Sequence, residues 1–321
     1  MNFSSQQPAS PFFSWFKVSL VFVIFLAVNF IMGNLHYPHV LFSSAIFILF
    51  ALHPNTRLFL VLAIPILLQN VIFDSFRFVP FHWYLPIHVR EPYLFDQYFF
   101  SIFYQGRTYL PHEFLMHFQR PLLDLISGAL YNVLDPVVVL LVVLFWKMKD
   151  EYFAARYTSA FLLMNFFAFA TYLFYPAAAP WYVSKYGFIS PLMPVPGSPA
   201  GLARFDQLLG LGVSKEFYSM SPVVFGALPS MHAGFTMLGF LYSLKLGKRW
   251  SIPIGIYSLG MWLSALYLEH HYVIDILLGI FYALIAYILM EKCFVKANAS
   301  ILDFLNKMLL YPKAPCLLGK K

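Results

Sequence analysis

The sequence contains few charged residues and almost no cysteine. Of its 321 residues, 11% are charged, 60% are hydrophobic and 20% are aromatic, whereas a soluble domain has about 25% charged residues. This composition excludes a soluble globular enzyme, and its hydrophobicity excludes intrinsic disorder. Two cysteines, Cys293 and Cys316, are too few for a disulfide framework or a cysteine metal site. The apolar residues form long runs without strict alternation, so we predict an all-α polytopic transmembrane helical bundle rather than a β-barrel.

The apolar runs predict between six and eight membrane spans. A helix that crosses the hydrocarbon layer needs about 20 apolar residues. The candidate runs are residues 13–33, 38–52, 57–73, 122–146, 154–175, 229–246, 251–268 and 271–291. The second and third are short and are joined by His53-Pro54-Asn55-Thr56. We predict that they form a helical hairpin, and their length leaves open whether they cross the bilayer fully.

Basic residues gather at the ends of the apolar runs and explain the net charge of +7. They flank two short turns and follow the last run, as Lys147, Lys149, Arg156, Lys245, Lys248, Arg249, Lys292 and Lys296. By the positive-inside rule these segments are cytoplasmic, and with eight spans both termini are cytoplasmic too. The long connections 74–121 and 176–228 then face the opposite side. Because no basic stripe is present, we expect the bilayer, and not nucleic acid, as the partner.

Two of the ten histidines open predicted membrane helices on the non-cytoplasmic side. His232 follows Ser230, a good N-cap, and the free N–H groups of a first helical turn bind anions. His271 opens the last helix, and Asp275 follows one turn later. The i, i+4 spacing places these two residues on one helix face. The carboxylate can therefore hold the imidazole in one tautomer and stabilise its cation.

A metal centre is not expected from the other histidines. Pro111-His112-Glu113-Phe114-Leu115-Met116-His117 places two histidines five residues apart. A zinc protease helix needs His-Glu-x-x-His, in which the two ligands lie on one face. The segment therefore does not fit such a site.

The two helix-opening histidines suit phosphoryl transfer through a phosphohistidine. One imidazole attacks phosphorus, and the other protonates the leaving alcohol and later acts as the base for the acceptor. A cation must balance the charge on the phosphate oxygens. Arg204 in the second long connection is the first candidate, and Lys185 is the second. The mechanism needs neither a metal nor another cofactor.

Several stretches resemble known families. Pro229-Ser230-Met231-His232 and His271-x-x-x-Asp275 resemble the second and third signature motifs of the type 2 phosphatidic acid phosphatase superfamily. Longer runs are similar to the fungal inositol phosphorylceramide synthases, the targets of aureobasidin. These runs are residues 175–182 (YPAAAPWY), 197–206 (GSPAGLARFD), 225–232 (FGALPSMH) and 267–272 (YLEHHY). The resemblance extends from about residue 122 to 291, with the same order and similar spacing.

The resemblance implies an enzyme that transfers phosphoinositol from phosphatidylinositol to a ceramide-type hydroxyl and releases diacylglycerol. It implies His271, His232 and Asp275 as the catalytic set, with Arg204, Ser230 and Lys185 as our candidates for binding the phosphate. The domains expected are N-terminal membrane helices with an interfacial segment (1–121), a catalytic membrane domain (122–293) and a short basic cytoplasmic tail (294–321). The membrane would be Golgi-type in a eukaryote and the inner membrane in a bacterium.

The superfamily's first motif, Lys-x6-Arg-Pro, is not reproduced. The one Arg-Pro pair is Arg120-Pro121, and Glu113 stands seven residues before that arginine. The third motif of the superfamily opens with Ser-Arg, where this chain has Ser264-Ala265. Two phosphate-binding cations are therefore missing from their usual places, which favours the transferase branch over a hydrolase.

Two alternatives to the transferase stay open. The first is a lipid phosphate phosphatase, in which water would reach the phosphohistidine. The second is a non-enzymatic membrane transporter or subunit. Whether the transferase has an accessory subunit is left open. Transporters commonly show inverted repeats and helices broken at mid-membrane. We detect no such repeats, and the ionisable residues gather at one interface.

Overall fold

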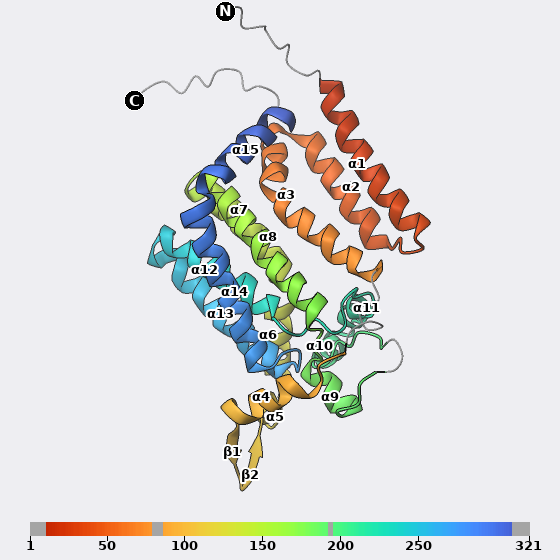
Figure 1. The fold of residues 1–321 in the computed structure, drawn as a ribbon, viewed down its shortest axis with the longest axis vertical. Coiled ribbons are helices and arrows are strands. Elements are labelled where there is room, and N and C mark those ends of the chain that lie inside the picture. Colours follow the sequence, from red (N-terminus) through yellow and green to blue (C-terminus); the bar gives the residue numbers. More distant parts are fainter. Residues whose placement is uncertain (1–10, 79–85, 192–194, 310–321) are drawn as a thin grey trace, which may run out of the picture. The chain divides into compact units, whose positions relative to one another are not determined.

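The computed structural model describes residues 11–78, 86–191 and 195–309, which are almost entirely helical (Figure 1). Cys316 lies outside the described residues. The backbone divides into two compact units, Met1–Ile64 with Val295–Lys321 and Pro65–Phe294. The all-α fold predicted from composition is confirmed.

In its described residues, the first unit contains two apolar helices, the beginning of a third helix and one helix near the C-terminus. They are α1 (Pro11–Ile31), α2 (Tyr37–Leu52), the beginning of α3 (Pro54–Ser75) and α15 (Val295–Leu309). The turn between α2 and α3 is stabilised by the Thr56 hydroxyl, which donates to the carbonyl of His53 at 2.6 Å. Pro54 suits the first position of α3 because a helix-starting residue needs no N–H partner. The helices thus lie where the first three apolar runs predicted them.

The second unit begins with the end of α3, continues through an irregular segment and then forms a helical bundle. The segment holds η1 (Phe76–Phe78), α4 (Arg90–Phe100), a two-stranded antiparallel sheet of β1 (Ile102–Tyr104) and β2 (Arg107–Tyr109), and α5 (Pro111–Met116). The bundle helices are α6 (Pro121–Asn132), α7 (Leu134–Met148), α8 (Glu151–Phe174), α12 (Met231–Ser243), α13 (Lys248–Tyr267) and α14 (Val273–Leu289). Short helices α9 (Pro180–Tyr186), α10 (Leu202–Leu209) and α11 (Val213–Ser219) lie in the long connection, and η3 (Leu244–Leu246) and η4 (Met290–Phe294) follow α12 and α14.

Close packing at the centre of the bundle depends on small residues. Helix α12 packs against α13 and α14, and α8 packs against α7, α12 and α14. Gly279 of α14 lies against the Ser230 carbonyl so closely that an added Cβ would sit 2.1 Å from the carbonyl oxygen. A glycine at this position thus leaves room for the close approach of the neighbouring turn. This contact brings the start of α12 against α14, where the two conspicuous histidines lie.

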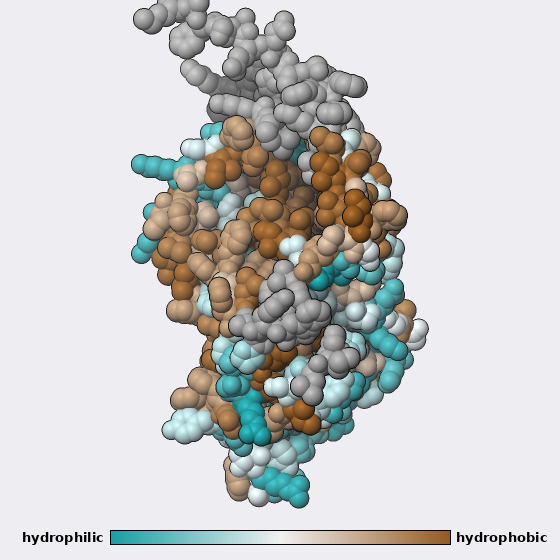
Figure 2. All heavy atoms as spheres, turned by 45° about the vertical axis from the view of Figure 1, so that its right-hand side comes forward, coloured by the Kyte–Doolittle hydropathy of each residue, from teal (hydrophilic) through white to brown (hydrophobic). Residues whose placement is uncertain are grey.

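Apolar side chains cover much of the visible surface over the helices (Figure 2). On the second unit, Leu140, Leu263 and Phe281 are among the exposed large apolar residues. Within the described residues, three helical stretches are long and apolar enough to span a bilayer, at Asn55–Phe78, Glu151–Phe174 and Val273–Asn306. The pair α6 and α7 would make a fourth. The chain is a membrane protein, and the larger number of spans stays a prediction.

The predicted span 122–146 falls on two helices, because the helix is broken at Val133. Helices α6 and α7 meet there at an angle of 51°. Pro136 lies in the first turn of α7. Because proline has no N–H, it cannot donate to the carbonyl of Asn132, four residues earlier, and α6 ends at that residue.

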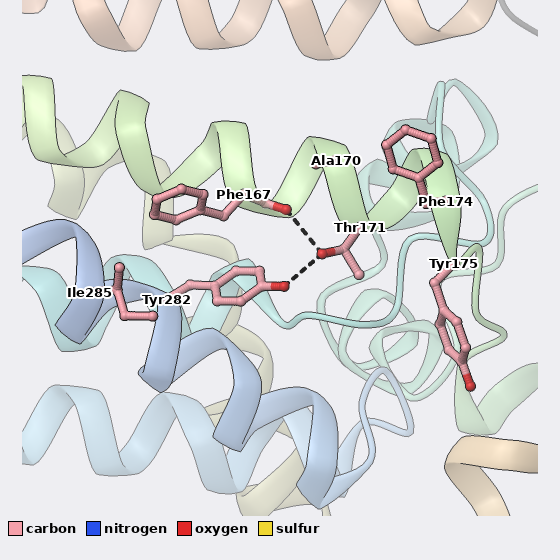
Figure 3. A pocket seen from close by; sticks show the side chains of 7 residues that line it. All are labelled: Phe167, Ala170, Thr171, Phe174, Tyr175, Tyr282 and Ile285. Atoms are coloured by element: carbon pink, nitrogen blue, oxygen red, sulfur yellow. Dashed lines mark hydrogen bonds between the residues drawn. The ribbon is translucent and has the colours of Figure 1, made fainter.

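Helices α8 and α14 are also joined by a hydroxyl pair. Thr171 Oγ1 and Tyr282 Oη lie 2.8 Å apart across the two helices (Figure 3). They border a pocket of 440 Å³ lined by Phe167, Ala170, Thr171, Phe174, Tyr175, Tyr282 and Ile285. The lining contains no histidine, carboxylate, lysine or arginine, so this pocket is not the site of the predicted acid–base chemistry.

Candidate active site

His271 is held by two acceptors at the start of α14. Its Nδ1 lies 3.0 Å from the Ala227 carbonyl oxygen and 3.4 Å from Asp275 Oδ2. Both neighbours are acceptors, so Nδ1 carries the hydrogen and donates chiefly to Ala227. The lone pair of the neutral ring is therefore on Nε2, which is available as a nucleophile. The predicted pairing of His271 with Asp275 is confirmed, although His271 lies just before the N-cap Tyr272 and not on a face of α14 itself.

Asp275 is completely buried, and its carboxylate contacts two neighbouring residues. Its Oδ2 accepts the backbone N–H of Tyr272 at 2.8 Å, which caps α14, and also faces His271. Within the described part of the chain, Oδ1 has no hydrogen-bond partner. Much of the carboxylate charge is thus left to stabilise a positive charge on His271.

The second histidine comes from α12 and lies beside the first. The ring centroids of His232 and His271 are 5.6 Å apart. Ser230 is the N-cap of α12, as predicted, since its hydroxyl accepts the N–H of Ala233 at 3.3 Å. The Ser230 N–H donates to the backbone carbonyl of Asp275 at 2.9 Å. The two motif turns are therefore fixed to each other through the backbone.

Tyr131 of α6 stacks on His232, a contact that sequence reasoning missed. The ring centroids are 4.0 Å apart with an interplanar angle of 19°. The Tyr131 hydroxyl is 3.2 Å from His232 Nδ1, but in stacked rings this oxygen lies over the imidazole and not along its in-plane lone pair. The contact is therefore a stacking interaction, which would stabilise a protonated His232 by about 0.5–2 kcal/mol.

The four runs that carry the resemblance meet at the His271 turn. His270 Nε2 donates to the Pro199 carbonyl at 3.1 Å, and the Gly201 N–H donates to the Leu268 carbonyl at 3.0 Å. Three further backbone hydrogen bonds connect the other runs: Trp181 to Glu269, Ala177 to Phe225, and Ala227 to Ala177. The long connection 176–228 is thus folded over the two histidines by its own backbone.

Arg204 and Lys185, the two predicted phosphate-binding cations, lie in this connection, and each has different neighbours. Arg204 Nε donates to Asp124 Oδ1 of α6 at 2.7 Å, and its Nη2 donates to the Tyr267 carbonyl at 3.4 Å. The Arg204 side chain is 25% exposed, so part of the guanidinium can reach a ligand. Lys185 is exposed on α9, and its Nζ lies 5.0 Å from the ring centroid of Tyr186. The charge of Arg204 is partly balanced by Asp124, whereas Lys185 extends from the surface.

Asp96, which the sequence did not single out, binds the start of α14 from α4. Its Oδ2 accepts the Val273 N–H at 2.7 Å, and its Oδ1 accepts the Ile274 N–H at 3.1 Å. The side chain is fully buried. Burial raises the pKa of Asp96 to about 6, while the two N–H donors act in the opposite direction. No sequence signal could have found this contact, because it joins residues 177 positions apart.

His112 lies in the same segment and is buried. Its ring meets that of Tyr272 edge to face at a centroid distance of 5.3 Å. Burial lowers the pKa of His112 to about 4, so it is neutral at physiological pH. The residue packs against the turn that carries His271.

Comparison with known proteins gives the chain a family. Residues 105–289 match the PAP2 superfamily. The phosphoinositol dihydroceramide synthase of Bacteroides thetaiotaomicron is 31% identical over 283 residues, which cover 87% of this chain and 92% of the relative.

Fungal proteins match over smaller shares of their length. The inositol phosphorylceramide synthase catalytic subunit of Schizosaccharomyces pombe is 31% identical over 242 residues, 74% of this chain and 55% of the relative. The catalytic subunit of Saccharomyces cerevisiae is 38% identical over 116 residues, 36% of this chain and 29% of the relative. No solved structure matches the chain. The family match covers more than half of the sequence and includes both histidine turns, and the chain belongs to the PAP2 superfamily.

Proposed function

We propose that this membrane protein transfers phosphoinositol from phosphatidylinositol to the hydroxyl of a ceramide-type lipid and releases diacylglycerol. The observation that carries the proposal is the pair of facing histidines, His232 and His271, with Asp275 behind the second. The choice of head group and acceptor is supported by the bacterial relative, whose name is phosphoinositol dihydroceramide synthase and which this chain matches over 92% of its length.

In the first half of the reaction, His271 is the nucleophile. Its Nε2 lone pair forms a bond to phosphorus, and the bond from phosphorus to the glycerol oxygen breaks. His232 gives a proton to that oxygen, so diacylglycerol leaves as a neutral alcohol. The imidazole ring of the phosphohistidine becomes cationic, and the buried carboxylate of Asp275, 3.4 Å from Nδ1, stabilises this charge.

In the second half, the acceptor takes the phosphoinositol group. His232, now neutral, removes the proton from the acceptor hydroxyl as its oxygen attacks phosphorus. The bond between nitrogen and phosphorus breaks, and its electron pair returns to His271 Nε2. His232 ends protonated and His271 ends neutral, so both are ready for another turnover, and no step requires a metal or another cofactor.

The phosphate oxygens need donors during both steps. We assign this role to Arg204, to the beginning of α12 that Ser230 caps, and to Lys185. The first helical hydrogen bond of α12 runs from the Gly234 N–H to the Ser230 carbonyl. The N–H groups of Met231 and His232 precede this bond and can therefore face an anion.

Substitution of Arg204 by lysine tests the guanidinium. Lysine keeps the charge but loses the planar fork that can hold Asp124 and a phosphate oxygen together. We expect kcat/KM to fall by about 10- to 100-fold, equivalent to the loss of one or two charge-assisted hydrogen bonds. Steady-state kinetics of Arg204→Lys would measure this loss, with Lys185→Arg measured for comparison. An unchanged kcat/KM of Arg204→Lys would contradict a role of Arg204 in binding the phosphate.

We further propose that the active site faces the non-cytoplasmic side and that both termini are cytoplasmic. The basic turns and the residues after α14 support this orientation. Residues 122–293 would form the catalytic membrane domain, 1–121 the N-terminal helices with an interfacial segment, and 294–321 a basic tail. The membrane would be Golgi-type in a eukaryotic cell or the inner membrane in a bacterium.

Acceptor dependence separates the transferase from a phosphatase of the same superfamily. The purified protein would be given phosphatidylinositol with and without dihydroceramide, and phosphatidic acid alone. The proposed function requires an inositol-containing sphingolipid only when the ceramide is present. Release of inorganic phosphate from phosphatidic acid, without any lipid alcohol, would support the phosphatase instead.

A further inference from the structure

Helix α14 begins at a place where two buried carboxylates share its free N–H groups. Asp275 accepts the N–H of Tyr272, and Asp96 accepts those of Val273 and Ile274. Asp275 is part of α14 itself, whereas Asp96 belongs to α4, in the irregular segment before the bundle. The first turn of α14 is thus held from a second, separate element.

The same segment also contacts the residue next to His271. Tyr272 is fully buried, and the rings of Tyr93 of α4 and His112 of α5 meet it edge to face, with centroid distances of 6.4 Å and 5.3 Å. Tyr93 in turn lies with its hydroxyl 3.4 Å from Glu113 of α5. The turn 271–274 is therefore enclosed by α4 and α5 as well as by the backbone of the long connection.

These contacts restrict the positions of both His271, the proposed nucleophile, and Asp275, which lies beside its ring. His271 and Asp275 lie on either side of the N–H groups that Asp96 binds, two residues before Val273 and one after Ile274. A rotation of the first turn would move Asp275 Oδ2 away from His271 Nδ1. It would also displace the Asp275 carbonyl, which accepts the Ser230 N–H and fixes the turn carrying His232.

We propose that Asp96 is a positioning residue for the transfer reaction, an inference that rests on the proposed function. By binding the Val273 and Ile274 N–H groups, it fixes the angle at which Asp275 and His271 are presented to the donor phosphate. Asp96 also occupies an anion-binding helix start. The Val273 and Ile274 N–H groups are therefore not free to bind the donor phosphate, whereas, among the described residues, those of Met231 and His232 are.

The test measures the first half-reaction in single turnover. With phosphatidylinositol and no acceptor, each active molecule releases one diacylglycerol, whose amount and rate constant are followed by rapid quench. Loss of folded protein lowers the amount, whereas misplacement of His271 lowers the rate constant. For Asp96→Ala we expect the rate constant to fall by at least about 10-fold, because a small misplacement from a remote change can cost about 100-fold.

Two further variants make the result specific. Asp96→Asn keeps one acceptor oxygen and should recover part of the rate constant. Asp150→Ala removes a helix-capping carboxylate of the same kind, one that accepts the Phe153 N–H at 2.7 Å at the start of α8. That position is about 30 Å along α8 from Tyr172, whose hydroxyl donates to Pro229 in the His232 turn. We expect Asp150→Ala to leave the rate constant within about twofold of the wild type.

The outcomes separate this inference from the proposed function. If the wild-type protein releases no diacylglycerol and forms no transfer product, the proposed function fails. If the wild type reacts and Asp96→Ala lowers only the amount released, with an unchanged rate constant, the role of Asp96 is structural and the inference is overturned. If Asp96→Ala does not fold, the rate constant of Asp96→Asn decides: equality with the wild type contradicts the inference, and a reduced value supports it.

Discussion

Replacement of His271 by alanine is expected to abolish phosphoinositol transfer while the protein still inserts and folds. The imidazole provides the Nε2 lone pair that forms the bond to phosphorus, and no neighbouring group can take its place at the same point. Loss of a catalytic histidine in subtilisin lowers kcat by about 10⁶-fold, so we expect a loss of at least about 10⁴-fold here. Turnover of labelled phosphatidylinositol by the purified variant would measure this loss.

His117, an exposed histidine directly after α5, provides the control for this prediction. His117→Ala removes an imidazole that contacts Tyr104 and Tyr109 at their ring edges, outside the pair of facing histidines. We expect its activity to stay close to that of the wild type. Substantial transfer by His271→Ala, in protein whose thermal unfolding matches the wild type, would refute the phosphohistidine.

Asp275→Asn is expected to produce the second largest loss. The amide oxygen can still accept the Tyr272 N–H and cap α14, so folding should be preserved. What disappears is the negative charge beside the His271 ring. The corresponding change in the Ser–His–Asp arrangement costs about 10⁴-fold, chiefly through the wrong tautomer.

In this protein the tautomer of His271 with hydrogen on Nδ1 does not depend on Asp275 alone, because Nδ1 also donates to the Ala227 carbonyl at 3.0 Å. We therefore expect a loss between about 10²- and 10⁴-fold in kcat, smaller than that of His271→Ala. Single-turnover release of diacylglycerol should slow by a similar factor, since the charge forms on His271 in that step. An Asp275→Asn variant with wild-type single-turnover kinetics would show that Ala227 alone suffices to orient the ring.

The helices could be predicted well because membrane segments are selected by length and hydropathy. The runs 154–175 and 251–268 fall on α8 and α13, with ends only a few residues away. The break at Val133 was missed although its cause, Pro136, is visible in the sequence. Residues 137–145 are uniformly hydrophobic, and this pattern predicts a single span although Pro136 lacks the N–H that a continuous helix would use.

The site could be predicted only where its residues are close in the sequence. Ser230 as a cap follows from the local sequence at the start of α12, and the pair of His271 and Asp275 from their four-residue spacing at the start of α14. Tyr131 and Asp96 could not be found in this way. Their partners lie 101 and 177 residues away, and only the packing of α4 and α6 against the helix starts brings them there.

The most direct test of the account is a mass-spectrometric analysis of the lipids made by the purified protein. The protein would be given phosphatidylinositol, phosphatidylcholine, phosphatidylethanolamine or phosphatidylglycerol as donor, each with dihydroceramide or diacylglycerol as acceptor. We expect one new lipid, an inositol phosphorylceramide-type product, formed together with an equal amount of diacylglycerol from phosphatidylinositol and absent with His271→Ala. A product carrying another head group, or free inositol phosphate without any sphingolipid product, would contradict it.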